Sequence, residues 1–329
     1  MPLNKRTLMT NYLVTAFYHF AKNNKYVELQ QPILKFCQKQ HLKGTILLAS
    51  EGINGTIAGD KESIVLFHDY IKNNGLFNGL FKNLEHKESW SKENPFYRMK
   101  VRLKKEIVAL GVEGVSPTKK VGRYVKPEDW NELISDPDTI IIDTRNDYEV
   151  DIGTFKNAIN PNTKTFREFP NYVDKNLDPA KHKKIAMFCT GGIRCEKATS
   201  LMLEKGFNEV YHLQGGILKY LEKVPENDSL WNGECFVFDQ RVAVKHDLIE
   251  GDYDQCYACR HPLSPDEMKS KDYKPGISCP YCINQLSHEK KHSLKERQHQ
   301  IELARLRGEL HIGKVMSKQK EKSYGKDEC

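Results

Sequence analysis

The chain has 329 residues, of which 39% are hydrophobic and 29% are charged, and its formal net charge is +7. This length predicts two or three domains, and the strand-sized apolar runs are too short to cross a membrane. The N-terminus lacks the apolar core of a secretory signal, so we expect a cytoplasmic protein with no membrane partner. A mildly basic chain permits a nucleic-acid partner without requiring one.

Strand and helix patterns alternate over the first part of the chain. Pro32 suits the first turn of the first helix, because backbone N–H groups have no helical partner there. The order β-α-β-β-α-β predicts a ferredoxin-like (acylphosphatase-like) α+β domain over residues 1–112. The expected strands are Leu13–Phe20, Thr45–Ala49, Gly55–Ala58 and Phe96–Val108, the last being one long strand or a strand pair, and the expected helices are Gln31–Gln40 and Lys61–Asn73.

Residues 113–122, with their Gly, Ser, Pro and Lys, predict a linker to a second pattern in which strands and helices alternate. Its strands are apolar without alternation, as expected of strands that are covered on both faces. We therefore expect an α/β domain with a parallel sheet over residues 123–226. Its predicted helices are Pro127–Ser135 and Cys195–Lys205, and its predicted strands are Thr139–Asp143, Lys184–Cys189 and Glu209–Leu213.

The sharpest chemical signal is the segment Cys189-Thr190-Gly191-Gly192-Ile193-Arg194-Cys195, which follows a predicted strand and precedes a helix. Two glycines allow a tight turn that directs backbone N–H groups and the positive helix end at the first sulfur. This environment lowers the pKa of a thiol and stabilises a thiolate or a persulfide. We expect Cys189 to be the nucleophile and Arg194 to add a fixed positive charge.

The alternative for Cys189 is a buried, inert thiol at a strand end. Cys195 is either a resolving thiol or a helix residue without a redox role. The spacing from Cys189 to Arg194 is C-x4-R, narrower than the C-x5-R loop that cysteine phosphatases wrap around a phosphate. The loop resembles the active-site loop of the rhodanese superfamily, and this resemblance extends to Asp143-x-Arg145 with Glu149, and to Leu-Gln-Gly-Gly-Ile at 213–217. We expect Asp143, Arg145 and Glu149 to orient the loop rather than to react.

A second cysteine cluster consists of two C-x2-C pairs, Cys256 with Cys259 and Cys279 with Cys282. The nine cysteines are an odd number in a chain expected to be cytoplasmic, which argues against a disulfide framework. Four thiolates at this spacing predict a closed, structural zinc site in the segment 227–286. The alternatives are unligated thiols and a competing ligand, His261. Residues 287–329 predict a polar, basic tail that is helical or disordered.

Four basic residues alternate with apolar ones along one predicted strand: Arg98, Lys100, Arg102 and Lys104. Like charges on one strand face repel each other unless a polyanion or acidic neighbours compensate them. The face is therefore either a nucleic-acid contact or a solvated surface paired with acids such as Glu51 or Glu106.

The combination of segments identifies a family. Ala-Ser-Glu-Gly-Ile-Asn-Gly-Thr at 49–56, the Cys189 loop, and Gly-Glu-Cys-Phe-Val-Phe-Asp at 233–239 together resemble the bacterial rhodanese-like tRNA uridine hydroxylases. The resemblance covers residues from about 10 to 285. It implies hydroxylation of the wobble uridine, position 34 of tRNA, at carbon 5, with molecular oxygen as co-substrate and Cys189 as the catalytic cysteine.

The residues alone indicate only sulfur chemistry. The sequence has no haem motif, no dinucleotide-binding glycine fingerprint and no identifiable iron site, so we expect no organic cofactor. One alternative is a thiosulfate sulfurtransferase that carries a persulfide. The other is a non-catalytic RNA-binding protein, against which the intact loop argues.

Overall fold

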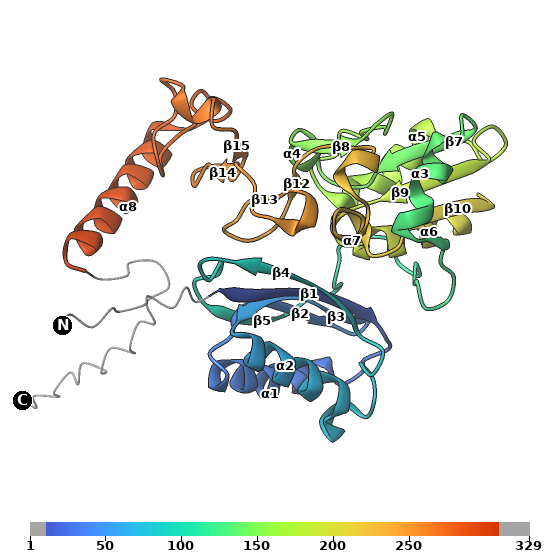
Figure 1. The fold of residues 1–329 in the computed structure, drawn as a ribbon, viewed down its shortest axis with the longest axis horizontal. Helices are drawn as coiled ribbons and strands as arrows, with labels where there is room; N and C mark the ends of the chain where they lie inside the picture. The colour runs from blue at the N-terminus through green and yellow to red at the C-terminus, as the bar shows by residue number, and fades with distance from the viewer. Residues whose placement is uncertain (1–10, 309–329) are drawn as a thin grey trace, which may run out of the picture.

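The computed structural model describes residues 11–308 as two α/β units, a small cysteine-rich region and a long helix (Figure 1). The far end of the predicted tail, 309–329, and the first ten residues lie outside the described residues. Within 11–308 no helix is long and apolar enough to cross a membrane.

The N-terminal unit is a sheet of strand order β4-β1-β3-β2-β5 with two helices on one face (Figure 1). The helix α2 has the predicted bounds, and the side chain of Asp60 caps it by accepting from the Ser63 N–H at 2.8 Å. The elements are β1 (Tyr12–Phe20), α1 (Tyr26–Lys39), β2 (Lys43–Ala49), β3 (Gly52–Gly59), α2 (Lys61–Asn73), β4 (Glu85–Ser91) and β5 (Met99–Leu103).

Two predictions for this unit were wrong. The last strand of the β-α-β-β-α-β motif is β4. Because β4 is an edge strand, it has too few apolar residues to be recognised in the sequence. Of the predicted strand Phe96–Val108 only β5 is formed, and it is an additional edge strand parallel to β2. Helix α1 also starts earlier than expected and has Pro32 in its interior. Leu29, Ile33 and Cys37 are buried at helical spacing, so core packing extends the helix on both sides of the proline.

The two faces of the N-terminal sheet have different surroundings. Leu13 and Phe17 of β1 point into the core beneath the helices, whereas Val14, Ala16 and Tyr18 point to the opposite face. That second face is turned toward the rest of the molecule (Figure 1).

The second unit has a parallel sheet of order β6-β10-β9-β7, which confirms the predicted α/β fold. The predicted linker 113–122 has neither helix nor strand, and its Val115 is buried in the core of this unit. The elements are β6 (Arg123–Val125), α3 (Pro127–Ser135), β7 (Thr139–Asp143), α4 (Asp147–Val150), β8 (Gly153–Phe155), α5 (Phe169–Asn176), β9 (Lys184–Phe188), α6 (Ile193–Glu204), β10 (Glu209–Leu213) and α7 (Gly216–Lys223).

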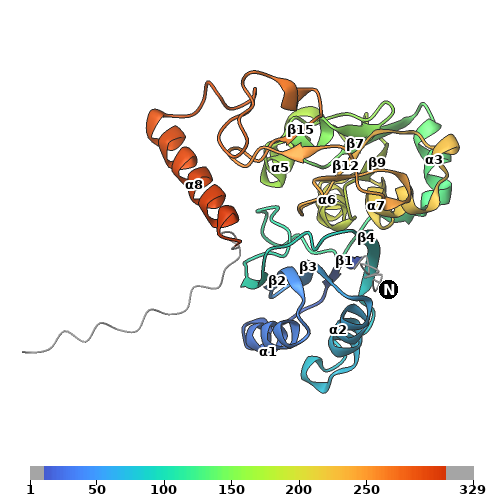
Figure 2. The same cartoon turned by 60° about the vertical axis from the view of Figure 1, so that its left-hand side comes forward.

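The remaining chain starts on the second unit, because β11 (Trp231–Gly233) pairs with β8. It then forms two small hairpins and ends in α8 (His288–Leu306), the helical part of the predicted tail, which lies to the left of both sheets in Figures 1 and 2. The hairpin strands are β12 (Cys235–Phe236) with β13 (Ala243–Val244), and β14 (Asp254–Gln255) with β15 (Pro262–Leu263).

Candidate functional site

A cavity of about 750 Å³ lies between the open face of the N-terminal sheet and the second unit. Tyr18 and Lys87 line it from the sheet, Cys189 and Arg194 line it from the opposite side, and Phe238 lines it from the chain that follows. Its volume is in the range of small-molecule sites. Three regions that are distant in the sequence therefore meet around one cysteine.

Cys189 directly follows β9, and the chain turns at Gly191 and Gly192 before α6 begins at Ile193. Gly192 has a φ of +97°, and its N–H donates to the Cys189 sulfur at 3.1 Å. Burial raises the pKa of Cys189, but a hydrogen bond from the Cys195 thiol, the charge of Arg194 and the N–H groups at the start of α6 outweigh it. The net effect lowers the pKa well below that of an ordinary thiol, which favours the thiolate.

Gly215 and Gly216, at the start of α7, bring this helix against the cysteine loop. The N–H groups of Ile217 and Leu218 donate to the carbonyls of Cys189 and Thr190, both at 3.0 Å. Gly216 has a φ of +69°, and a Cβ there would lie 2.4 Å from the Cys189 oxygen. A residue with a side chain at 216 would displace the cysteine, which explains the Leu-Gln-Gly-Gly-Ile segment.

Arg194 does not extend a free guanidinium into the cavity. Its two terminal nitrogens donate to the two oxygens of Glu149, both at 2.7 Å, and this ion pair is almost fully buried. Thr190 also donates to Glu149 at 3.2 Å. The pair thus ties the loop to α4 while placing positive charge near Cys189.

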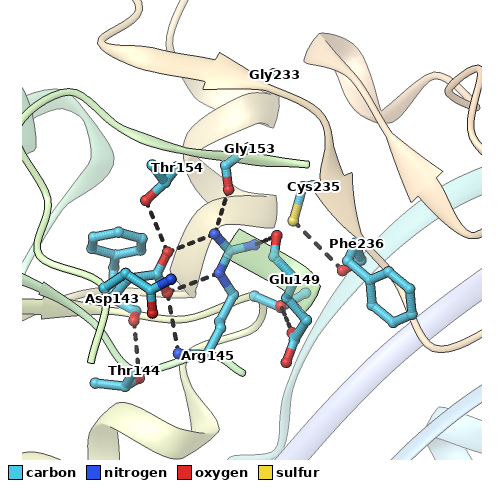
Figure 3. A network of polar contacts seen from close by, with 12 residues as sticks. Asp143, Thr144, Arg145, Glu149, Gly153, Thr154, Gly233, Cys235 and Phe236 are labelled. Atoms are coloured by element: carbon cyan, nitrogen blue, oxygen red, sulfur yellow. Dashed lines mark hydrogen bonds and ion pairs between the residues drawn. The ribbon is translucent and has the colours of Figure 1, made fainter. Parts of the chain in front are cut away.

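Beneath the loop lies a second buried ion pair, shown in Figure 3. Arg145 Nη2 lies 2.6 Å from Asp143 Oδ2, and both side chains have no exposed surface. Arg145 also donates to the carbonyls of Glu149 at 3.0 Å and of Gly153 at 2.6 Å. The three residues expected to support the loop therefore form one connected network with it.

Cys195 lies in the first turn of α6 and is completely buried. Burial and the neighbouring Cys189 raise its pKa well above that of an ordinary thiol. It therefore keeps its proton, and its sulfur lies 3.5 Å from the Thr144 hydroxyl.

The N-terminal unit contacts this loop directly. The Lys87 ammonium donates to the carbonyl of Gly191 at 2.9 Å. The hydroxyl of Tyr18 donates to Glu196 at 2.9 Å, and Tyr124 donates to the other oxygen of that carboxylate at 2.8 Å. Sequence reasoning missed these residues, because Lys87 lies on the unrecognised β4 and only the tertiary fold brings it to the loop.

The Glu-Gly-Ile-Asn-Gly segment also connects the two units. Glu51 accepts from the Ile107 N–H at 2.6 Å and pairs with the buried Lys197 of α6 at 2.7 Å. Glu106 pairs with the same lysine at 2.6 Å. The segment thus positions α6, whose first turn faces the cysteine loop.

Comparison with known proteins agrees with these features. A family described as a UPF0176 acylphosphatase-like domain matches residues 12–107, and the rhodanese-like domain family matches residues 126–223. A tRNA uridine(34) hydroxylase of Teredinibacter turnerae is 57% identical over 306 residues, which are 93% of this chain and 94% of the relative. The chain belongs to the tRNA uridine(34) hydroxylase family.

Two solved structures are similar to parts of this chain. A rhodanese-related protein from Thermoplasma volcanium is 24% identical, with a TM-score of 0.25, over 31% of this chain and 93% of its own. An acylphosphatase from Coxiella burnetii is 15% identical, with a TM-score of 0.22, over 28% of this chain and 93% of its own.

The predicted basic face lies at the edge of the cavity. Lys100 and Arg102 of β5 are in register with Thr45 and Leu47 of β2, which line the cavity, and so share their face of the sheet. Arg98 and Lys104 lie just outside the strand, so the expected alternation covers only its centre. Within residues 11–308 none of the four basic side chains forms a salt bridge, since Glu51 and Glu106 both pair with Lys197.

A further cation joins this face from the cysteine-rich region. Burial lowers the pKa of Lys100, and the charges of Arg98, Arg102 and Arg260 lower it further, so Arg260 acts on the same lysine as the arginines of the basic face. Arg260 is exposed and has a φ of +74°, so the turn between the two cysteine pairs presents it outward. Sequence reasoning missed Arg260 because nothing in the sequence brings it beside β5.

Phe238 gives the cavity an apolar wall that remains 61% exposed. Its ring lies 5.9 Å from the Arg194 guanidinium. Arg241, three residues on, pairs with Asp239 and donates to Ser89 of β4 at 2.7 Å, which fixes this segment against the N-terminal unit. The Phe-Val-Phe-Asp motif was a usable signal, although the sequence alone did not show which aromatic ring faces the cavity.

The four predicted metal ligands converge. Cys256 and Cys282 sulfurs lie 3.9 Å apart, and Cys279 lies 3.7 Å from both Cys259 and Cys282. Tetrahedral zinc with Zn–S bonds of about 2.3 Å requires sulfur separations of about 3.8 Å. His261 is outside this group and packs on Tyr281 with ring centroids 3.7 Å apart.

Proposed function

We propose that this protein is a tRNA-modifying enzyme of the cytoplasm that hydroxylates carbon 5 of uridine 34, with Cys189 as the nucleophile. The observation that carries the proposal is the low-pKa Cys189 facing an interdomain cavity in a chain 57% identical to a tRNA uridine(34) hydroxylase. A thiolate is the reactive form of cysteine, and the cavity has the size of a small-molecule site.

The thiolate adds to carbon 6 of uracil, and the electron pair of the C5–C6 bond makes carbon 5 nucleophilic. Carbon 5 bonds to molecular oxygen, a proton completes the hydroperoxide, and loss of the carbon 5 proton expels the thiolate and restores the double bond. Two equivalents of a small thiol reduce the O–O bond, giving 5-hydroxyuridine, water and a disulfide. Atoms and electrons balance with the thiol as the reductant.

Phe238 and the basic residues near the cavity suit the substrate. An exposed aromatic ring that stacks on a flipped base contributes about 1–3 kcal/mol, and Phe238 has that exposure beside Arg194. The cations of β5 with Arg260 suit the phosphates of tRNA. The cysteine cluster suits a structural zinc ion, which would hold Cys256, Cys259, Cys279 and Cys282 together and would fix Arg260.

The test is the nucleoside content of tRNA from cells that lack the protein and are complemented with wild type or Cys189→Ser. We expect 5-hydroxyuridine derivatives, measured by mass spectrometry, only with wild type. Cys37→Ala, which removes a buried thiol from the N-terminal core, is the matched control and should restore them. Equal restoration by Cys189→Ser would disprove the role of Cys189 and would favour the non-catalytic RNA-binding alternative.

Sulfurtransferase activity is the second candidate, because the same N–H groups that stabilise the Cys189 thiolate also suit a persulfide anion. It predicts turnover of thiosulfate and cyanide without tRNA and without oxygen. Hydroxylation that needs oxygen and tRNA, together with negligible thiocyanate formation, would decide for the first function.

A further inference from the structure

The peptide bond between Gly191 and Gly192 is held at both of its polar atoms. Its N–H, from Gly192, donates to the Cys189 sulfur at 3.1 Å. Its carbonyl, from Gly191, accepts from the Lys87 ammonium at 2.9 Å. Because the C=O and N–H of a trans peptide point in opposite directions, the lysine and the sulfur lie on opposite sides of one rigid plane.

This peptide has little intrinsic resistance to rotation. Both of its residues are glycines, which have access to most backbone conformations. A Cβ added to Gly191 would meet nothing within 4 Å, whereas one added to Gly192 would lie 2.9 Å from the Tyr18 hydroxyl, so neighbouring atoms crowd the peptide only on its Gly192 side. A flipped peptide would direct its carbonyl oxygen, instead of its N–H, toward the thiolate and would repel it.

Lys87 is an unusual partner for a carbonyl, because its ammonium is buried and forms no salt bridge with any residue from 11 to 308. Its other close contact is the ring of Tyr18, 5.2 Å from the nitrogen. Burial lowers the pKa of Lys87 to about 8, so the side chain is still mainly charged at neutral pH. The charged groups that face it are Glu85 on its own strand, and Cys189, Glu196 and Lys219 from the second unit.

A buried charge without an acidic partner is costly and tends to mark a functional position. We propose that Lys87 is a positioning residue that holds the Gly191–Gly192 peptide with its N–H toward Cys189, so that docking of the N-terminal sheet sets the reactivity of the thiol. The positive charge at the carbonyl also polarises the peptide and strengthens its N–H as a donor. The inference goes beyond the proposed function, since it concerns the thiol whichever substrate it attacks.

The test is the pH dependence of Cys189 alkylation by iodoacetamide in the intact protein, without tRNA. Trypsin releases residues 185–194 as a peptide whose single cysteine is Cys189, so mass spectrometry follows this thiol separately from the others. We expect Lys87→Met to raise the midpoint of alkylation by about one pH unit, which slows alkylation about 10-fold at pH 5, below the midpoint, and about twofold at pH 7. Lys87→Arg should retain the wild-type midpoint.

The matched control is Lys219→Met, because Lys219 is a neighbouring cation that pairs with Glu222 and donates to no atom of the cysteine loop. It should leave the rate at pH 5 within about twofold of wild type. If Lys87→Met fails to fold, Lys87→Gln, which keeps a donor without the charge, should still slow alkylation at pH 5 several-fold. A wild-type rate and midpoint in the folded variant, or an equal loss in Lys219→Met, would overturn the inference. Failure of tRNA hydroxylation would leave this result unaffected.

Discussion

Cysteine is used in two opposite ways in this molecule. In the rhodanese loop one sulfur, Cys189, receives an N–H from Gly192 and faces a cavity of about 750 Å³. In the cysteine-rich region four sulfurs lie within 4.8 Å of one another, three of their separations being 3.7–3.9 Å, and the apolar residues Leu263 and Leu286 pack around them. Cys189 is buried in the wall of a cavity, whereas the cluster sulfurs are directed at one another and only Cys259 among them is exposed.

The two cysteine centres differ in the residues that surround the sulfur atoms. Their local sequence motifs do not explain the difference, since both contain turns with glycine or proline. The loop cysteine rests on buried ion pairs, Arg194 with Glu149 and Arg145 with Asp143, that belong to the protein itself. Among residues 11–308 no ion pair involves the cluster, and four thiolates there would need a bound metal ion to offset their mutual repulsion. Each centre should therefore fail independently of the other.

The largest expected effect is loss of the metal. Protein purified without chelator should contain one zinc ion per chain, and Cys279→Ser should contain none, because four ligands are needed to close the site. Structural zinc contributes about 10–16 kcal/mol in zinc-finger peptides at neutral pH, so hydrogen exchange of residues 254–286 should become fast. Elemental analysis and exchange mass spectrometry measure both.

The same variant should alkylate Cys189 at the wild-type rate, since the cluster contributes no atom to the cysteine loop. Cys37→Ala is the control that retains the metal. A metal-free wild type, or a Cys189 that slows together with the cluster, would show that the two centres are not independent.

The next largest effect concerns the support beneath the loop. Arg145→Met leaves Asp143 and two carbonyls buried without their donor, and breaking such a pair costs about 3–5 kcal/mol. Denaturant unfolding should show this loss, whereas the exposed Lys156→Met should change stability by less than about 0.5 kcal/mol. A near-neutral Arg145→Met would mean that the network is not what holds the loop.

The two cysteine centres show which parts of the site can be predicted from the sequence. The strand end, the glycines and Arg194 are contiguous, so the sequence predicts the Cys189 loop and its anion-stabilising geometry. The two C-x2-C pairs likewise predict that their four sulfur atoms meet at one site. Local patterns suffice when the chemistry is local.

The contacts of Lys87, Phe238 and Arg260 could not be predicted, because each depends on a neighbour from another region of the chain. Lys87 was missed twice, since β4 is a polar edge strand and the partner carbonyl lies on a different unit. The same reason explains β5, which was expected to close the motif and instead extends the sheet. Strand order and the packing of one unit on another belong to the tertiary structure, and the hydrophobic periodicity of the sequence does not predict them.

The third effect tests which centre contacts RNA. Replacing Arg98, Lys100 and Arg102 together with Ala should weaken tRNA binding and reduce the slope of log affinity against log salt by about 3, if each meets one phosphate. Arg260→Gln, from the region of the cysteine cluster, should reduce it by about 1. Filter binding over a range of salt concentrations measures both slopes.

The control is Lys39→Gln at the end of α1, on the face of the sheet opposite the cavity. It should leave the slope unchanged. Equal slopes for the triple variant and wild type would place the RNA surface away from β5, and an effect confined to Arg260→Gln would assign it to the cysteine-rich region.

The smallest expected effect comes from replacing Asp60, a residue distant from both cysteine centres. Asp60 caps α2, and the N–H of Ser63 lowers the pKa of its carboxyl. Asp60→Ala should reduce the free energy of unfolding by about 1 kcal/mol. Because the folded pKa is below the ordinary Asp value of about 3.9, the contribution is complete at neutral pH and is lost as the pH falls through the folded pKa, so unfolding curves of the two proteins should converge in acid. Cys189 alkylation and zinc content of Asp60→Ala should match wild type. A change in either would show that the two cysteine centres respond to any loss of stability, and not only to loss of the residues that contact them.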